Sequence, residues 1–172
     1  NQRSSLGLIY RNNLLYPKLD RELKGKVIDV GCGIGDFLKF KVDAFGTDVN
    51  INNVEYCKAN GLNVSFMKEG KIPHDDSSFD SAILDNVLEH VDEPEFLLSE
   101  ICRILSKDGY LIVGVPGLKG YDSDSDHKIF YDETLLEKTL SKNNFLLKKF
   151  FYMPLFKSTF LSKKIRQYCL YG

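Results

Sequence analysis

Three glycines at alternating positions could bind a small molecule through their main chain. Gly31, Gly33 and Gly35 directly follow the short apolar run Val27–Val30, which carries Asp29. Glycine lets the backbone adopt conformations that other residues avoid and lets a ligand approach main-chain atoms closely. A helix starting near Ile34 would offer its unpaired N–H groups to that ligand. The pattern predicts a ligand-binding turn between a strand and a helix.

A further carboxylate, Asp48, ends the next strand-like run, Phe45–Asp48. In doubly wound folds, an acid at the end of the second strand binds the ribose hydroxyls of a nucleotide-like ligand. A carboxylate can accept hydrogen bonds from both hydroxyls, which a neutral side chain does less well. The spacing therefore predicts an adenosine-containing ligand, although a solvated Asp at the end of a strand is the alternative.

The glycine spacing distinguishes between adenosine cofactors. A dinucleotide site has the pattern G-x-G-x-x-G, whereas this chain has G-x-G-x-G, with Asp36 at the third dinucleotide position. Asp29 and Asp36 would be poor neighbours for a pyrophosphate. S-adenosylmethionine instead carries an ammonium and a sulfonium, and both are attracted to carboxylates. The spacing favours S-adenosylmethionine over NAD.

Six segments together resemble the class I S-adenosylmethionine-dependent methyltransferases, in the branch with the type 11/12 pattern. They occur in the family's order, over roughly residues 25–150. The segments are VIDVGCGIGDFL (27–38), GTDVN (46–50), IPHDDSSFD (72–80), LEHVDEP (88–94), EICRILSKDG (100–109) and YLIVGVP (110–116). The resemblance implies an α/β fold with a doubly wound, mostly parallel sheet and helices on both faces, the Rossmann-like fold of the family.

The resemblance also assigns roles to residues of the cofactor site. Asp29 would reach the methionine amino group, or alternatively cap the glycine turn. Where relatives carry an acid for the adenine amino group, this chain has Lys68, so either Glu69 or the main chain near it would contact the adenine. The expected cofactor-binding set is Asp29, Gly31, Cys32, Gly33, Gly35, Asp48, Val49, Asn50, Glu69, Gly70, Lys71, Asp85, Asn86 and Val87.

Three residues are candidates for catalysis. Asp85, at the end of the fourth strand, could stabilise the sulfonium or orient an acceptor hydroxyl. His90 belongs to a Glu-His pair that is common in the family and would act as a base or only border the cleft. His127 lies in the loop 117–131, where the family covers its acceptor pocket, and is the first choice for a general base. Tyr131 is expected to line that pocket.

Length and composition limit the class of protein. The 172 residues carry a net charge of −1, so nothing favours nucleic acid as a partner. No apolar run could span a bilayer, and no secretory signal is recognised, although a chain that begins at Asn1 is expected to lack a few residues. Four cysteines without paired spacing suggest a reducing cytoplasm. The three histidines are scattered in sequence, and no metal site is predicted.

Alternating strand-like and helix-like segments predict a single parallel-sheet domain over residues 1–172. It would comprise a helical segment at 1–24, a cofactor-binding core at 25–116 and an acceptor-side part at 117–172. Predicted strands are 26–30, 44–48, 63–67, 81–85, 110–115 and 146–152. Predicted helices are 5–22, an unusually short 34–41, 51–60, 93–106 (closed by Gly109) and 132–143. A seventh strand is uncertain: it lies near 168–171, or the chain is truncated.

The C-terminal stretch is basic and aromatic. Its residues 156–166 would suit an amphipathic helix that contacts the protein itself, a second subunit or an anionic membrane surface. The sequence as a whole predicts methyl transfer from S-adenosylmethionine to a small-molecule acceptor, with S-adenosylhomocysteine as product. O-methylation of a saccharide or similar metabolite is the leading expectation. The alternative is a non-catalytic, cofactor-binding partner subunit.

Overall fold

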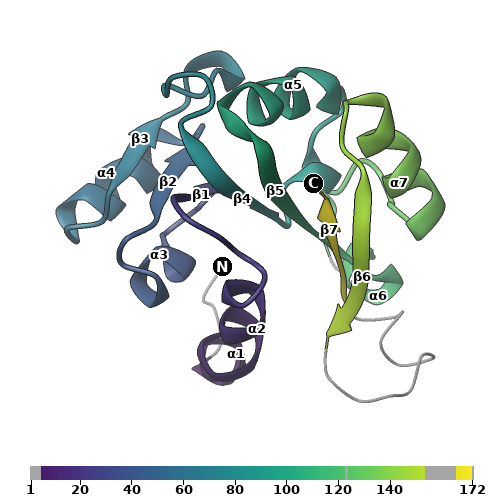
Figure 1. The fold of residues 1–172 in the computed structure, drawn as a ribbon. Coiled ribbons are helices and arrows are strands. Elements are labelled where there is room, and N and C mark those ends of the chain that lie inside the picture. Colours follow the sequence, from purple (N-terminus) through teal and green to yellow (C-terminus); the bar gives the residue numbers. More distant parts are fainter. Residues whose placement is uncertain (1–4, 123, 154–165, 172) are drawn as a thin grey trace.

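A single seven-stranded sheet organises the molecule. The computed structural model describes residues 5–122, 124–153 and 166–171. The strand order is β3-β2-β1-β4-β5-β7-β6, with β1 to β5 parallel and β7 antiparallel to both neighbours (Figure 1). The strands are β1 (Val27–Val30), β2 (Phe45–Asp48), β3 (Val64–Phe66), β4 (Phe79–Asp85), β5 (Leu105–Pro116), β6 (Leu147–Met153) and β7 (Arg166–Tyr171).

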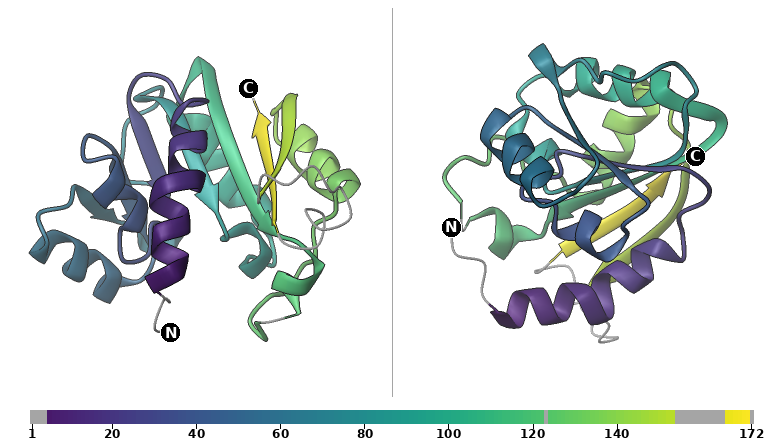
Figure 2. Two further views of the ribbon diagram at one scale, coloured as in Figure 1. Left: turned by 90° about the horizontal axis from the view of Figure 1, so that it is seen from below. Right: turned by 90° about the vertical axis from the view of Figure 1, so that its left-hand side faces the viewer.

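Helices cover both faces of this sheet. The longer α-helices are α4 (Ile51–Ala59), α5 (Pro94–Ile104) and α7 (Glu133–Lys142). The shorter elements are α1 (Ser5–Tyr10), the π-helical turn η1 (Arg11–Leu15), α2 (Tyr16–Asp20), α3 (Asp36–Phe40), the 3₁₀ turns η2 (Lys68–Gly70) and η3 (Leu88–His90), and α6 (Leu118–Tyr121). Figure 2 shows α1 and α2 on one side of the sheet, with α5 and α7 on the other. Among the described residues, none of these helices is long and apolar enough to cross a membrane.

Alternation along the strands explains the two layers. Successive side chains of a strand point to opposite faces, so a buried parallel strand is apolar throughout. Val27 and Ile83 pack with the N-terminal helix, α3 and α4, while Ile28 and Ala82 pack with α5 and α7. The predicted doubly wound architecture is confirmed, and the order reverses between β1 and β4 as expected. That reversal leaves a crevice at the carboxyl ends of these strands.

Helix α5 differs from the prediction at its end. It begins with Pro94 in its first turn, where the missing proline N–H costs no helical hydrogen bond, but it ends at Ile104. The chain turns at once into β5, whose pairing with β4 shifts between Phe79 and Ser81. Gly109 therefore lies within that irregular part of the strand and does not close the helix. Residues 105 and 106, predicted as the end of the helix, are the first residues of β5, which pairs with β4.

The structure defines the length of the first crossover helix and the position of the last strand, which are the two unusual features of the sequence-based prediction. Helix α3 has only five residues, in agreement with the short helix that the sequence predicts. The seventh strand, β7, lies where the first alternative put it and is inserted between β5 and β6. The C-terminal helix predicted over residues 156–166 lies outside the described residues except for Arg166, which begins β7.

Candidate active site

The glycine turn after β1 adopts the backbone conformation that its sequence suggests. Gly31, Gly33 and Gly35 have φ values of 76°, 55° and 73°, in the left-handed region where other residues are strained. The N–H groups of Gly31 and Cys32 both donate to the Thr47 carbonyl, at 2.7 and 3.1 Å. These bonds hold the turn against the end of β2.

Asp48 fastens the same turn from the side. Its Oδ2 accepts the Gly33 N–H at 2.7 Å, and its Oδ1 accepts the Asn50 N–H at 2.8 Å and the Asn53 side-chain amide at 3.3 Å. The side chain is only 6% exposed. A carboxylate offers about four lone-pair positions, so acceptor capacity remains for a ligand. Asp48 therefore shapes the glycine turn in addition to the ribose contact that the sequence suggests.

Two adjoining cavities run along the carboxyl ends of the parallel strands. The larger, about 560 Å³, lies over the glycine turn, and the smaller, about 350 Å³, lies over Asp48 and Val49. Gly31, Asn86 and His90 line both. The shared lining makes one elongated crevice, in which the smaller part is mostly apolar through Met67 and Phe96.

The crevice collects most of the predicted cofactor residues. The larger cavity is lined by Asp29, Gly31, Cys32, Gly33, Asp85 and Asn86, and the smaller by Asp48, Val49, Gly70, Asn86 and Val87, besides Gly31. The cavity linings leave out Gly35, Asn50, Glu69 and Lys71. Gly35 precedes α3, and Asn50 caps α4 through its side chain.

A profile of the methyltransferase domain family matches residues 28–113, half of the chain. The match spans the glycine turn, Asp48 and the fourth strand. The chain belongs to the class I S-adenosylmethionine-dependent methyltransferases. Members of this family use S-adenosylmethionine as the methyl donor, and they are enzymes.

Relatives in sequence include proteins of different size. An uncharacterised protein of Methanocaldococcus jannaschii is 28% identical over 83% of this chain and 67% of its own length. A ubiquinone/menaquinone biosynthesis C-methyltransferase of Campylobacter jejuni is 31% identical over 51% of this chain and 43% of its own. A ubiquinone biosynthesis O-methyltransferase of Pelagibacter ubique is 26% identical over 55% and 43%. The chain thus spans less than half the length of these two methyltransferases.

Solved structures share the fold at lower identity. A methyltransferase of Thermotoga maritima, described as a possible histamine N-methyltransferase, has a TM-score of 0.78 at 21% identity, over 97% of this chain and 91% of its own. A methyltransferase of Aquifex aeolicus has a TM-score of 0.73 at 20% identity, over 94% and 91%. Both support the fold of this methyltransferase domain.

The adenine-side segment departs from the expected roles. Glu69 is exposed, with a φ of 52°, and Lys71 lines a separate cavity with His74 and Arg103. Only Gly70 of this segment faces the crevice. Met67 and Phe96 were missed by the sequence analysis, because a Met at a strand end and a Phe on a helix usually indicate core packing.

The N-terminal helix contributes side chains that the sequence did not single out. Arg11 and Tyr16 line the larger cavity, as does Asp36, which accepts an ion pair from Arg11 at 3.4 Å. Tyr16 packs edge-on against Phe37, with ring centroids 5.3 Å apart, and burial raises its pKa well above the usual range. Arg11 begins the π-helical turn η1, a locally widened part of the helix, and Tyr16 begins α2 directly after it. No short motif marks such residues in a sequence.

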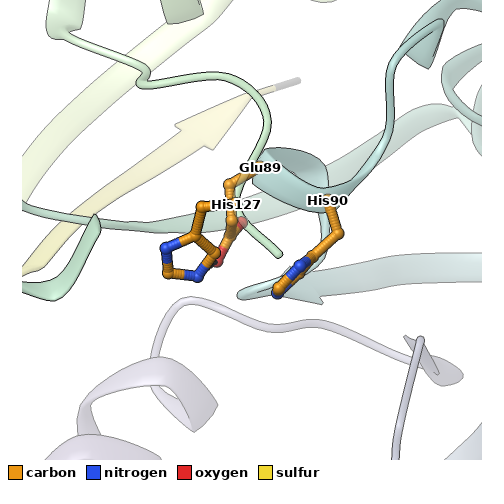
Figure 3. A group of neighbouring side chains, drawn as sticks. All are labelled: Glu89, His90 and His127. Atoms are coloured by element: carbon orange, nitrogen blue, oxygen red, sulfur yellow. Dashed lines mark ion pairs between the residues drawn. The ribbon is translucent and has the colours of Figure 1, made fainter. Parts of the chain in front are cut away.

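The far end of the larger cavity brings together His90 and His127, which are 37 positions apart. Their ring centroids are 4.7 Å apart, and both line the cavity with Asp124. Glu89 lies beside them, and one ligand atom from each of the three lies within 4.8 Å of the others (Figure 3). Two histidines that are far apart in the sequence thus lie together in the fold, beside Glu89.

The turn carrying His127 is fastened to η3 by main-chain bonds. Lys128 and Ile129 donate their N–H groups to the Glu89 carbonyl at 2.8 and 3.2 Å, and the Lys128 ammonium pairs with Asp92. Tyr131 follows but does not line either cavity: it is buried in the core, and burial raises its pKa to about 12. The expected pocket role of Tyr131 is wrong, because the chain turns inward to begin α7.

Proposed function

We propose that this domain transfers a methyl group from S-adenosylmethionine to an oxygen of a small polar metabolite, such as a saccharide. One observation carries the proposal. Besides the glycine turn, the larger cavity is lined by six charged or hydrogen-bonding side chains: Arg11, Tyr16, Asp36, Asp124, His90 and His127. Such a lining suits a hydroxylated acceptor.

The chain's residues fit the donor in shape and charge. The apolar cavity with Met67 and Phe96 suits the adenine, and Asp48 at its edge suits the ribose. Asp29 is only 5% exposed and lines the larger cavity at the base of the glycine turn, where it would accept a methionine ammonium. Both cavity volumes are in the range of small-molecule sites. S-adenosylmethionine supplies an already activated methyl group when bound.

The residues' main task is then to hold two reactants in line and to exclude water. Well-oriented reactants alone account for large accelerations, so a strong base is not essential. Asp85 lies at the end of β4 in the larger cavity, where it accepts a hydrogen bond from Asn86 at 2.9 Å. It would orient the acceptor hydroxyl or stabilise positive charge.

His127 is the proposed general base. Its Nδ1 lies 2.8 Å from the Tyr121 carbonyl, which can only accept, so Nδ1 carries the proton. In the neutral ring Nε2 then has its lone pair available for a proton from the acceptor. The Tyr121 ring stacks on His127 at a centroid distance of 5.4 Å and restrains it.

The lining of the larger cavity also bears on other acceptors. Two relatives are named for ubiquinone or menaquinone biosynthesis, and Leu19, Phe37, Ile83 and Pro116 give the same cavity apolar surface, so acceptors of that kind belong in the test. Unpaired thiols at Cys32, Cys57 and Cys102 support a reducing, cytoplasmic location. Self-association or membrane-surface contact through the C-terminal segment stays part of the proposal.

A two-step experiment tests this function. Calorimetry with S-adenosylhomocysteine, S-adenosylmethionine and NAD should show binding of the first two only. Release of S-adenosylhomocysteine is then followed with sugars, nucleotide-linked sugars, catechols and amines as acceptors. Turnover with a hydroxylated acceptor supports the proposal. Cofactor binding without turnover on any class would favour the non-catalytic subunit, and preferential NAD binding would overturn both.

A further inference from the structure

The cluster of Glu89, His90 and His127 has more than a proton-transfer geometry. Glu89 is completely buried, and its Oε1 lies 3.9 Å from Nε2 of His127. One donor atom from each residue lies within 4.8 Å of the other two. Figure 3 shows the His127 ring beside the Glu89 carboxylate, with His90 entering from the adjacent turn.

Main-chain carbonyls show which nitrogen of each imidazole carries the proton. Nδ1 of His127 faces the Tyr121 carbonyl at 2.8 Å, and Nδ1 of His90 faces the Asp126 carbonyl at 3.2 Å. A carbonyl has no proton to give, so each Nδ1 is the donor. Each neutral ring therefore keeps Nε2 as an electron-pair donor. A nitrogen of each ring and a carboxylate oxygen of Glu89 lie within 4.8 Å of one another, and a cation between them would be attracted by all three.

The surrounding bonds are those that orient metal ligands. In metal sites a histidine donates its second N–H to a carbonyl or carboxylate, which fixes the tautomer and the ring. Both histidines here do so. The Glu89 main chain is also held, because its carbonyl accepts the N–H groups of Lys128 and Ile129. The turn after Asp126 is thus fastened to η3 at the point where the three side chains meet.

We propose that Glu89, His90 and His127 bind one divalent transition-metal ion at the acceptor end of the crevice. Two imidazoles with one carboxylate form a donor set used for zinc and for non-haem iron, with positions left open for water or substrate. Magnesium and calcium prefer sets made of oxygen only, so they fit less well. Metal–ligand bonds of about 2.0–2.2 Å require the three donors to approach one another by roughly 1 Å.

The open positions would face the larger cavity, because His90 and His127 line it and Asp124 lies in the same lining. If the proposed methyl transfer holds, an acceptor hydroxyl bound to the ion has a lowered pKa and gives its proton to water. Its oxygen then forms the new bond to the methyl carbon as the sulfur–carbon bond of the donor breaks. His127 would in that case act as a ligand and not as the base. The metal site itself does not depend on that reaction.

Cobalt(II) is the probe for the test, because its visible absorption reports the ligand set. The full chain is treated with a chelator, freed of it and titrated with CoCl₂, with competition by ZnCl₂. The variants are Glu89→Gln, His90→Asn and His127→Asn. His74→Gln is the matched control, because His74 bonds Ser65 at 3.2 Å and takes no part in the cluster. Melting curves accompany every variant.

The expected result is one equivalent of cobalt bound by the wild type and by His74→Gln. Loss of an outer-shell partner usually weakens metal binding 10–100-fold, so loss of a ligand should weaken it by at least about 100-fold. Should Glu89→Gln fail to fold, the half-exposed His90→Asn still decides the matter. Absent or non-stoichiometric binding, or equal binding by all the variants, would overturn the site.

The two proposals can fail separately. Nitrogen-resolved NMR of the metal-free chain identifies an imidazolium at His127. If His127 is protonated and cobalt does not displace that proton, then the proton and not a metal ion supplies the positive charge. This result would overturn the site. Full methyl transfer by a chelator-treated protein that binds no cobalt also overturns the site, and leaves the proposed function standing. Cobalt bound by the cluster of a protein that transfers no methyl group supports the site and overturns the proposed function.

Discussion

The two ends of the crevice are built differently. At the donor end, Gly31 and Gly33 lie in the turn that follows β1, Asp48 ends the adjacent strand β2, and hydrogen bonds link the turn to Thr47 and Asp48. At the acceptor end, His90 belongs to a 3₁₀ turn and His127 to a loop 37 positions later in the chain, and bonds from Lys128 and Ile129 to Glu89 join the two segments. The donor end is therefore specified by local sequence, and the acceptor end by tertiary contacts. Under the proposed function, loop substitutions would change the acceptor specificity and leave the donor end untouched.

The largest expected effect is on the acceptor end. His127→Ala should lower turnover by about 10²–10⁴ while leaving the affinity for S-adenosylhomocysteine nearly intact, because general-base groups contribute about that factor. Steady-state kinetics and calorimetry measure the two quantities, with His74→Gln as control. An equal loss of cofactor affinity would show that the two ends are not separable.

The reverse is expected at the donor end. Asp48→Ala should weaken S-adenosylhomocysteine by about 1.5–3 kcal/mol, the value of hydrogen bonds to a charged group. It should also lower stability, since the Gly33 and Asn50 N–H groups lose their acceptor. Asp43→Ala is the control, because that side chain is 74% exposed and pairs only with Lys41. If a folded Asp48→Ala variant kept its affinity for S-adenosylhomocysteine, another residue would have to bind the ribose.

Acid should weaken the hydrogen bonds of Glu100, which accepts from Ile72, two residues after Gly70 of the smaller cavity. Glu100 is 8% exposed; the hydrogen bond from Arg103 holds its pKa below the usual value, and the Ile72 N–H adds to this. A carboxyl whose pKa is lower in the folded state than in the unfolded state, near 4.3, stabilises the fold at pH values above the unfolded-state pKa. That stabilisation is lost as the pH falls through the folded-state pKa. Glu100→Gln should cost about 1–3 kcal/mol near neutral pH, because Arg103 loses one of its two carboxylate partners and keeps only Asp76. Denaturant unfolding at pH 7 and pH 3.5 should show the difference between variant and wild type shrinking in acid.

A pair of glycines separates backbone strain from a steric clash, and the smallest effect is expected at Gly61. Gly61 and Gly31 share a left-handed φ, of 72° and 76°. A Cβ at Gly61 meets nothing within 4 Å, whereas one at Gly31 would lie 2.5 Å from a Val87 methyl. Gly61→Ala should cost about 1–2 kcal/mol of stability from backbone strain alone. Gly31→Ala should cost more and weaken the cofactor as well. Equal costs would mean that Val87 moves aside freely.

Sequence patterns predicted the sheet, its order at the β1–β4 reversal and most of the residues that line the crevice around the glycine turn. They did so because Val27–Val30, the glycines and Asp48 act through neighbours in the chain or in the next strand. The meeting of Glu89, His90 and His127 could not be predicted, because it depends on how residues 122–131 fold onto η3. Tyr131 was misplaced for the same reason. Arg11 and Tyr16 line the cavity only because the N-terminal helix packs beside α3.

The inserted strand β7 has a consequence for the order of assembly. β6 precedes β7 in the chain but lies beyond it in the sheet, so within the described sheet β6 pairs with β7 alone. β6 can join only together with β7 or after it, which makes the hairpin a cooperative unit that closes late and opens first. The amide groups of β6 and β7 should therefore exchange hydrogen at similar rates. Both strands should exchange faster than β1 and β4 at the centre of the sheet.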